Sequence, residues 1–293
     1  MSKITLENIS YIYSPGTPFE MRALDGVNLN IRENAVTGLI GHTGSGKSTL
    51  VQLLNGLSRP TEGRVLLDGV DIWEKTKQIR QIRFRVGLVM QYPEYQLFEE
   101  TVRADIAFGP KNMGLGEDEI ALRVQEAAEL TGLDASLLER SPCDLSGGQK
   151  RRVAIAGIIA MRPEVLVLDE PAAGLDPRGR DTILHMLREY QGKTGATVII
   201  VSHSMEDMAR FCDDIIVLAK GKLVMQGSTQ QVFARSDELL SVGLNIPEIS
   251  HVCMMLRQRG IPVDEGIFTL EQAERCLLRL AAGQHGSKAE VKL

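Results

Sequence analysis

The chain has 293 residues, enough for one large domain or two smaller ones around a buried core. Its net charge of −5 excludes a global positive field that would attract nucleic acid. The four cysteines form no C-x-x-C pair, which predicts reduced thiols in the cytosol rather than disulfides or a zinc site. The first residues lack the apolar core of a signal peptide, and no apolar run approaches the ~20 residues that span a bilayer. We therefore expect a soluble protein, whose membrane role would depend on a partner.

Two predicted strands open the chain. Alternating apolar residues indicate one strand from Ile4 to Tyr13 and a second across residues 27–31. Such a pair, standing before a glycine-rich loop, predicts an antiparallel flap that could hold an adenine ring against an aromatic side chain. Tyr13 is our choice for that contact, with Tyr11 as the alternative, and packing of Tyr13 within the strand is nearly as favoured.

A glycine-rich loop follows, and the rest of the chain is organised around it. It fits the pattern G-x-x-x-x-G-K-[ST] without a gap and reads Gly41-His42-Thr43-Gly44-Ser45-Gly46-Lys47-Ser48-Thr49. Residues 35–40 read as a buried strand, and leucines recur at helical spacing after the loop. In this context the backbone N–H groups surround phosphate oxygens at a helix N-terminus. We expect Lys47 to reach the β- and γ-phosphates and the Ser48 hydroxyl to bind Mg²⁺.

The next segment combines strands with a polar strand end. The Asp68-Gly69 pair predicts a tight hairpin turn between residues 65–67 and 70–72. A further strand, 86–90, leads into Gln91 and a proline-containing loop, which we interpret as a mobile contact. From residue 101 to 161 the pattern is helical, and Gly132 is expected to end one of these helices.

A second glycine pair opens a helix at Leu145-Ser146-Gly147-Gly148-Gln149, called the pentapeptide below. Ser146 is a suitable N-cap, and two glycines at a helix start allow a phosphate to approach the exposed N–H groups. The pentapeptide has two interpretations, an anion-binding site and a capped helix without a ligand. By itself it favours neither of them.

Two acidic residues end the next buried strand, 165–168. The carboxyl end of such a strand is where α/β sheets bind ligands. We expect Asp169 to lie near a Mg²⁺ held by Ser48, and Glu170 to orient a water for in-line attack. A further buried strand, 197–201, ends close to His203, which we expect to hydrogen-bond to the γ-phosphate.

Helices are predicted between and after these strands. Pro177 is expected to begin a helix, with Gly192 past its end. Two amphipathic helices are expected between residues 246 and 283, and a capping box from Thr269 to Gln272 opens the second. Residues 284–293 are polar and are expected to be flexible.

Taken together, these motifs resemble, in order and spacing, those of the ATP-binding cassette ATPases over roughly the first 235 residues. The resemblance implies an α/β P-loop NTPase fold: a RecA-like core, an antiparallel β flap, an inserted helical subdomain at about 92–161 and a small C-terminal helical extension. The implied domains are a cassette at 1–243, a helical dimerisation segment at 244–283 and a flexible tail at 284–293.

The same resemblance implies ATP and Mg²⁺ as cofactors and assigns roles to single residues. The implied catalytic residues are Lys47, Gln91, Glu170 and His203, and the implied metal ligands are Ser48, Gln91 and Asp169. The glycine-rich loop Gly41–Thr49, called the phosphate loop below, is implied to hold ATP in its own subunit. The pentapeptide residues Ser146, Gly147, Gly148 and Gln149 are implied to grip the ATP of a facing subunit, and Asp176 is implied to be a nucleotide contact. With one phosphate loop and one pentapeptide, the chain would need a second chain to complete each site.

Four shorter segments resemble the energy-coupling factor transporter ATPases: Pro15–Glu20, Gln91–Phe98, Leu145–Gly157 and Ile246–Ile249. These transporters have two paralogous ATPase subunits, and the segment Pro15–Glu20 resembles that of the second subunit. This resemblance implies ATP-driven uptake of vitamins or metal ions, with the chain peripheral at the cytoplasmic face of the membrane.

The expected partners follow from the same resemblance. They are a second ATPase subunit, paralogous rather than identical, and a transmembrane scaffold protein that meets residues 91–98, where Glu94 is expected to pair with an arginine. A substrate-binding membrane subunit would be met indirectly, and no nucleic acid is expected.

Three alternatives are weaker. A conventional importer ATPase for amino acids, cobalt or nickel is the first. A cassette ATPase of DNA maintenance would need a long coiled coil between phosphate loop and pentapeptide, which are separated by only about a hundred residues. A cassette translation factor, which acts on ribosomes, is the third. Such factors carry two cassettes in one chain, whereas this chain has one. The transported substrate, the choice between homodimer and heterodimer, and the ATP stoichiometry stay open.

Overall fold

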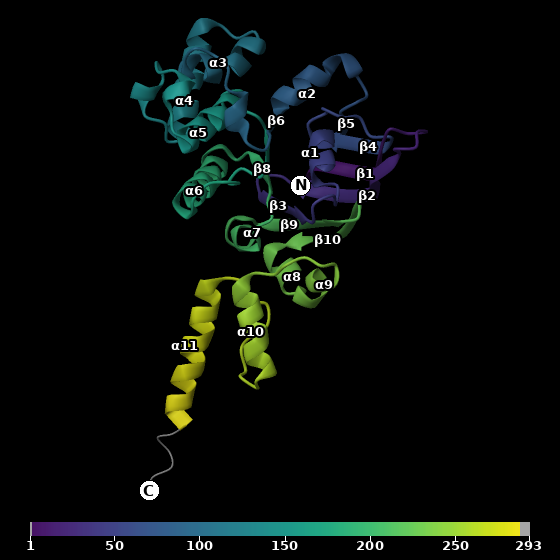
Figure 1. Ribbon diagram of the computed structural model, residues 1–293, viewed down its shortest axis with the longest axis vertical. Coiled ribbons are helices and arrows are strands. Elements are labelled where there is room, and N and C mark those ends of the chain that lie inside the picture. Colours follow the sequence, from purple (N-terminus) through teal and green to yellow (C-terminus); the bar gives the residue numbers. More distant parts are fainter. Residues whose placement is uncertain (1, 288–293) are drawn as a thin grey trace.

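The computed structural model describes residues 2–287 and contains two β-sheets (Figure 1). The larger sheet has the strand order β10-β9-β3-β8-β7-β6, and the smaller one has the order β2-β1-β4-β5. The larger sheet consists of β3 (Val36–Gly41), β6 (Val86–Val89), β7 (Val165–Asp169), β8 (Thr197–Val201), β9 (Asp214–Ala219) and β10 (Lys222–Ser228). The smaller, antiparallel sheet consists of β1 (Ser2–Tyr13), β2 (Met21–Arg32), β4 (Glu62–Leu67) and β5 (Val70–Asp71).

Five strands of the larger sheet run parallel, and only β10 is antiparallel to its neighbour. Along β7, Val165 and Val167 join one apolar cluster while Leu166 and Leu168 join the other. Both faces are therefore buried, which explains the unbroken apolar runs in the sequence. The parallel arrangement also places the carboxyl ends of β3, β6, β7 and β8 along one edge of the sheet.

Helix α1 (Lys47–Leu54) joins the two sheets. Its leucines share an apolar cluster with residues of β1, β2 and β4 on one side and of β7, β8 and β9 on the other. The predicted hairpin turn is confirmed, because Asp68 and Gly69 both have positive φ, 52° and 79°. Helix α2 (Ile79–Arg85) was not predicted; it has only seven residues and buries none of them fully, so its apolar pattern is too short to be recognised.

Three helices form a group beside the larger sheet: α3 (Val102–Asn112), α4 (Glu117–Leu130) and α5 (Gly147–Ile159) (Figure 1). Helix α4 buries Val124, Ala127 and Ala128, the face that the periodicity indicated. Gly132, two residues past its end, has the left-handed φ of 64° expected of a helix stop. The apolar side chains of this group merge with one face of the larger sheet.

Helix α6 (Pro177–Thr194) begins at Pro177 as predicted, but the prediction that Gly192 lies past its end is wrong. Gly195 ends it instead, with a left-handed φ of 69°. The last turns stay helical because Tyr190 is buried against the core, and this contact outweighs the low helix propensity of one glycine.

Helices α7 (Met205–Phe211), α8 (Thr229–Phe233) and α9 (Ser236–Ser241) lead to α10 (Glu248–Gln258) and α11 (Leu270–Ser287). The last two extend away from the sheets (Figure 1) and enclose a small core of their own, which contains Cys253, Val263, Ile267, Ala273 and Cys276. The capping box at α11 is confirmed, because Thr269 Oγ1 accepts from the Gln272 N–H at 3.3 Å and Gln272 Oε1 accepts from the Thr269 N–H at 3.2 Å.

The segment predicted to be flexible is only partly described, since α11 includes Ser287 and residues 288–293 lie outside the described residues. Within residues 2–287, no helix is both long and apolar enough to cross a membrane.

Candidate nucleotide site

The phosphate loop connects the end of β3 to the start of α1, as the sequence predicts. Gly46, the N-cap of α1, has a φ of 102°. A Cβ atom at this position would lie 2.7 Å from the Ala23 carbonyl oxygen and 2.7 Å from Leu24 Cδ2. Only glycine fits there, because the backbone passes directly over β2 in a conformation that other residues avoid.

Lys47 is buried and points into the loop. Its Nζ donates hydrogen bonds to the carbonyl oxygens of Gly41 (2.7 Å) and His42 (2.9 Å). Burial lowers the pKa of the ammonium group, while the carboxylates of Glu170 and Asp169 oppose that shift. The cation thus lies among the loop carbonyls, close to the carboxylates of Asp169 and Glu170 at the end of β7.

Ser48 and Asp169 are in direct contact across the site. The Ser48 hydroxyl donates a hydrogen bond to Asp169 Oδ2 at 3.2 Å. A hydroxyl and a carboxylate are the oxygen ligands that Mg²⁺ prefers, and Mg²⁺ in nucleotide sites takes its other ligands from phosphates and water. Within residues 2–287 no group of three His, Cys, Asp or Glu side chains could hold a metal ion by itself.

Glu170 lies one residue beyond β7 and is strained and partly desolvated. Its φ is 52°, and its N–H donates to the Val201 carbonyl at 3.0 Å. Burial, and then the neighbouring charge of Asp169, raise the pKa of Glu170 to about 7. Oε1 is buried without a hydrogen-bond partner in the described structure. A carboxylate with a pKa near neutrality and a free oxygen is suited to accept a proton from water.

His203 approaches Glu170 from the neighbouring strand. Its Nε2 lies 3.3 Å from Glu170 Oε1, a contact between the two groups that does not form a hydrogen bond. Burial, followed by the charge of Lys47, lowers the pKa of His203, which favours the neutral ring. The ring therefore lies beside the site with a nitrogen still able to contact a ligand.

Tyr13 and Tyr11 differ in their contacts. The Tyr13 hydroxyl is 3.0 Å from Thr49 Oγ1 in the phosphate-loop helix, whereas Tyr11 packs against the apolar cluster between the sheets. The two rings meet edge to face with centroids 4.8 Å apart. Tyr13 is thus the tyrosine that reaches the loop. Gln91 is exposed just past the end of β6, the strand next to β7.

The pentapeptide belongs to the helical group. Ser146 caps α5 by accepting from the Gln149 N–H at 3.3 Å, and Gln149 Oε1 accepts from the Ser146 N–H at 2.9 Å. Positions Gly147 and Gly148 have open space where a side chain would stand. Asp176 caps α6 in the same way, accepting from the Gly179 N–H at 2.6 Å. Within this chain both motifs act as helix caps, and these capping hydrogen bonds do not involve Lys47.

Glu94, which we expect to pair with an arginine of the membrane scaffold, already has an arginine partner in its own chain. Its carboxylate accepts two hydrogen bonds from Arg151 of the same chain, from Nε at 2.9 Å and from Nη2 at 2.6 Å. Each carboxylate oxygen thus accepts one hydrogen bond from within the chain. Arg151 itself was missed, because it is the middle residue of the basic run 150–152 and nothing in that run distinguishes a buried arginine from an exposed one.

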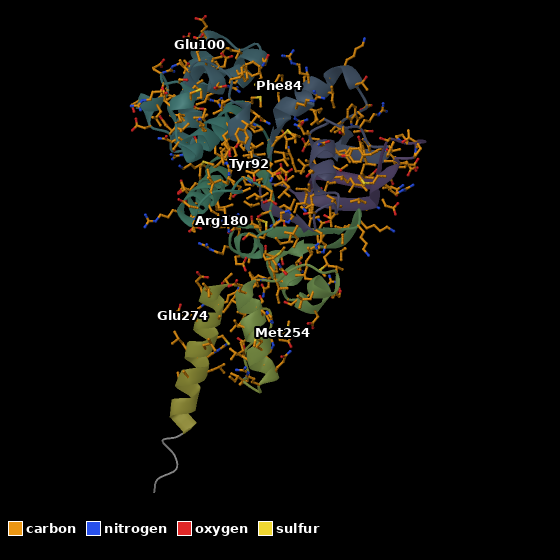
Figure 2. All side chains as sticks on the ribbon, in the orientation of Figure 1. Phe84, Tyr92, Glu100, Arg180, Met254 and Glu274 are labelled. Carbon is orange, nitrogen blue, oxygen red and sulfur yellow. The ribbon has the colours of Figure 1, made fainter. Side chains whose placement is uncertain are left out.

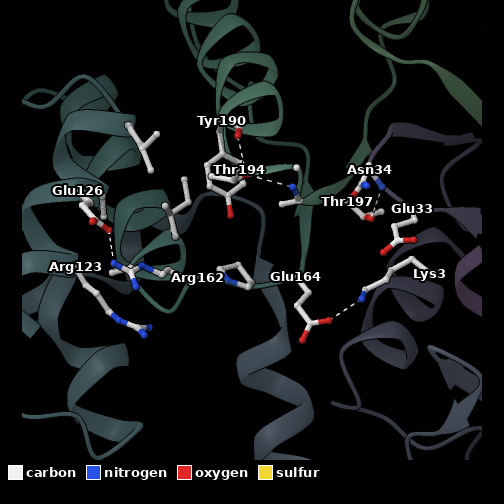
Figure 3. Close-up of a pocket in the computed structure, with 17 residues that line it drawn as sticks. Lys3, Glu33, Asn34, Arg123, Glu126, Arg162, Glu164, Tyr190, Thr194 and Thr197 are labelled. Atoms are coloured by element: carbon white, nitrogen blue, oxygen red, sulfur yellow. Dashed lines mark hydrogen bonds and ion pairs between the residues drawn. The ribbon is translucent and has the colours of Figure 1, made fainter. Parts of the chain in front are cut away.

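A cavity of about 400 Å³ lies at the opposite edge of the larger sheet (Figure 3). It is lined by residues that precede β3, β7 and β8, among them Asn34, Glu164 and Ala196. Charged side chains in its wall are already paired with one another: Lys3 with Glu164 at 2.6 Å, and Arg162 with Glu126 at 2.6 Å. Ligands of parallel α/β sheets bind at the carboxyl ends of the strands, so this cavity is not the nucleotide site.

Known proteins resemble this chain along most of its length. Residues 24–173 match the family model described as ABC transporter. The energy-coupling factor transporter ATP-binding protein EcfA2 of Caldanaerobacter subterraneus subsp. tengcongensis is 50% identical over 280 residues, covering 96% of this chain and 98% of that protein. The protein of the same name from Clostridium acetobutylicum is 51% identical over 278 residues, covering 94% and 97%.

Solved structures agree in fold. CbiO1 of Clostridium perfringens, described as part of the ABC transporter complex cbiONQ, has a TM-score of 0.74 and 42% identity, covering 86% of this chain and 99% of that one. The ATP-binding cassette MJ0796, a dimer in a post-hydrolysis state with ADP and Pi, has a TM-score of 0.69 and 28% identity, covering 77% and 98%. The P-loop fold, the site and these relatives agree, and the chain belongs to the ABC transporter ATPases, among the ATP-binding proteins of energy-coupling factor transporters.

Proposed function

We propose that Glu170 orients the attacking water in the ATP hydrolysis that this chain, as an ABC transporter ATPase, performs to drive an energy-coupling factor importer. The observation that carries this assignment is the buried, unpartnered Oε1 of Glu170 beside the Ser48–Asp169 contact. A base next to the phosphate and metal ligands can take up a water proton while the γ-phosphoryl group is transferred.

The other residues of the site bind and position. Lys47 can turn from the loop carbonyls toward β- and γ-phosphate oxygens, and the α1 N-terminus adds N–H donors to the phosphates. Ser48 and Asp169 would hold Mg²⁺, which supplies charge neutralisation for the phosphates when bound. His203 and Gln91, at the ends of strands on either side of β7, are placed to contact the γ-phosphate side of the nucleotide. Tyr13 is placed to contact the adenosine side.

The test is Glu170→Gln in the full chain. General-base catalysis contributes roughly 10²–10⁴ in rate, so hydrolysis should fall by about that factor while ATP binding stays intact and closed dimers accumulate. Steady-state ATPase activity and equilibrium ATP binding are measured together. Glu189→Gln on the exposed face of α6 is the control. Near-normal turnover of Glu170→Gln would remove Glu170 from this role.

We also infer that the working unit contains two cassettes arranged head to tail, with the pentapeptide of each chain closing the site of the other. The capped α5 leaves the Gly147 and Gly148 positions open, as an incoming phosphate requires. The dimeric MJ0796 cassette supports this arrangement. We favour a paralogous partner subunit over a second copy, and the similarity to EcfA2 supports this choice.

The surface for the membrane scaffold is proposed to be the groove beside residues 91–98. This groove of about 350 Å³ is lined by Phe84, Phe98, Phe108 and Met161, with rings 98 and 108 packed edge to face at 4.9 Å. Tyr95 is 84% exposed and Phe98 65% exposed, so these aromatic side chains are available to a helix of a membrane protein. Docking there would hold the chain at the cytoplasmic face of the membrane, in contact with the substrate-binding subunit only through the scaffold.

The docking proposal is tested with Phe98→Glu. Uptake by the whole complex, or co-purification with the membrane subunits, should be lost, because a carboxylate in the groove cannot be buried against an apolar helix. ATPase activity of the isolated ATPase dimer should stay within about twofold of wild type, as for most surface substitutions. Phe19→Glu, on the exposed loop between β1 and β2, is the matched control. Full uptake by Phe98→Glu contradicts docking at this groove.

A further inference from the structure

Arg151 is a buried cation that connects three segments of the chain. It lies on α5 two residues past the pentapeptide, and only 2% of its surface is exposed. Beyond the two hydrogen bonds to Glu94, its Nη1 donates to the carbonyl oxygens of Pro171 (3.2 Å) and Ala173 (2.5 Å). A planar guanidinium has its donors in a rigid fork, so these contacts determine one position for each partner relative to α5.

The first partner is the segment that follows Gln91. Glu94 lies in a short 3-10 helix, Pro93–Gln96, and Tyr92 before it has a left-handed φ of 54°. The Tyr92 ring centroid is 5.8 Å from the Arg151 guanidinium carbon, and its Cε1 would lie 3.6 Å from a Cβ at Gly174. In Figure 2 Tyr92 appears between the helical group and the sheets. The groove-lining segment is therefore linked to the loop 171–174 through Arg151, and the Tyr92 ring lies on the side of Gly174 where a side chain would stand.

The second partner is the loop that follows Glu170. Pro171 and Ala173 supply the carbonyls that Arg151 holds, and the Ala173 N–H donates to the Glu170 carbonyl at 3.1 Å. Glu170 itself has a strained, positive φ, a conformation that persists only where neighbouring contacts enforce it. A displacement of Arg151 would therefore be transmitted to the backbone that aims the Glu170 carboxylate.

Charge holds together the junction that Arg151 forms between the segment 92–96, α5 and the loop 171–174. Burial alone would raise the pKa of Glu94, but hydrogen bonds from Arg151 and the charge of Arg151 hold it below its ordinary value. Glu94 is thus ionised, and separating it from Arg151 would leave two buried charges unpaired. The junction is expected to move as one piece rather than to open.

We propose that Arg151 is a positioning residue: it makes the groove segment 92–96, α5 and the loop 171–174 move together, so that the placement of the groove segment sets the aim of Glu170. The inference rests on the proposed role of Glu170. It adds a route by which a shift of the groove beside residues 91–98 reaches the reacting water without passing through the nucleotide. Misplacing a catalytic group by about 1 Å can cost 10²-fold in rate, so a small shift at this junction is sufficient to switch hydrolysis.

The experiment uses the whole transporter complex with Arg151→Lys, Glu94→Gln and the double variant. Lysine keeps the charge but cannot form the fork, and glutamine keeps the shape but not the ion pair. We measure kcat and KM for MgATP, with kcat normalised to the number of ATP-binding sites found by equilibrium binding. Each single variant should lower kcat roughly 10-fold to 100-fold with KM changed less than about twofold, since Glu170 is misaimed while ATP is still held.

Two features of the result separate positioning from general stability. The double variant should be no slower than the slower single variant, because both substitutions break one unit. Arg152→Lys is the matched control, since it makes the same change one residue along α5, where the side chain donates only to the Gly132 carbonyl within the described structure. Its kcat should equal that of wild type.

An unchanged kcat in Arg151→Lys and Glu94→Gln overturns the proposal, as does a loss confined to KM or to the number of ATP-binding sites. If Arg151→Lys does not fold, Glu94→Gln decides alone. If kcat is unchanged in these variants while Glu170→Gln is inactive, the Arg151 inference is refuted and the Glu170 assignment stands. If Glu170→Gln is active, the Glu170 assignment itself is refuted.

Discussion

Ser146 shows at the scale of one residue how a helix cap and a ligand contact can coincide. Ser146→Arg should cost about 1 kcal/mol of stability through the lost cap. ATP binding to the isolated chain should be unchanged, because the phosphate loop is untouched. Hydrolysis by the assembled dimer should be blocked, since the arginine would fill the space that the glycine pair leaves for the partner's nucleotide. Equilibrium ATP binding and dimer turnover are the two measurements.

Ser146→Thr, which keeps a hydroxyl at the cap, is the control and should hydrolyse ATP. Lys47→Ala gives the opposite pattern, with ATP binding lost in its own subunit, because Lys47 is the cation of the loop. If Ser146→Arg abolished ATP binding by the isolated chain, the pentapeptide would belong to the same subunit's site and the two-chain arrangement would be wrong.

Between elements, Glu164 ties the start of β7 to the smaller sheet and to α2. It accepts from Lys3 of β1 at 2.6 Å and from Arg85 of α2 at 2.6 Å, and these contacts lower its pKa to about 2. A depressed carboxyl pKa stabilises the fold above the unfolded-state value near 4.5, and this contribution is lost as pH falls from there toward 2. Because 41% of the Glu164 side chain is exposed, solvent screening limits the contribution to about 1 kcal/mol.

Glu164→Gln should therefore lower the free energy of unfolding by about 1 kcal/mol at pH 7 and make stability fall less steeply between pH 4.5 and 2. Denaturant unfolding at several pH values measures both effects. Glu139→Gln removes a single exposed ion pair with Arg103 and should change neither. Parallel pH curves for Glu164→Gln and wild type would show that the pairing does not stabilise the fold.

In the whole molecule, the C-terminal helices α10 and α11 follow a segment that touches the nucleotide loop. His42 Nε2 lies 2.7 Å from the Val242 carbonyl, and α10 and α11 follow from there with their own small core. Deleting residues 246–293 should leave a folded domain that binds ATP, destabilised on the order of 1–3 kcal/mol because Phe268 leaves the main core. Association with the second subunit should weaken, most clearly without ATP, and sedimentation with and without nucleotide measures it.

Leu278→Glu in the full chain separates the two effects of this deletion. Leu278 is 63% exposed on α11, so its replacement should weaken association while leaving the unfolding midpoint unchanged. Glu274→Gln on the same helix is the control. A dimerisation constant unchanged by both the deletion and Leu278→Glu would show that α10 and α11 do not hold the subunits together.

Much of this protein is determined by its sequence alone. Unbroken apolar runs predict β7 and β8, because both faces of a parallel strand are buried wherever the strand lies. The loop ending in Lys47 and Ser48 and the caps at Ser146 and Thr269 depend on backbone conformation and on neighbours within four residues, so local residue types are sufficient to predict them.

Tertiary structure alone decided what depends on distant neighbours. Gly192 stays helical because Tyr190 is packed into a core built by other segments. Glu94 has an ion-pair partner inside the chain, because folding brings Arg151 to it from 57 residues away. The raised pKa of Glu170 likewise requires the burial and the Asp169 charge that the assembled sheet edge provides. Burial and long-range pairing are properties of the packed chain, which no local pattern contains.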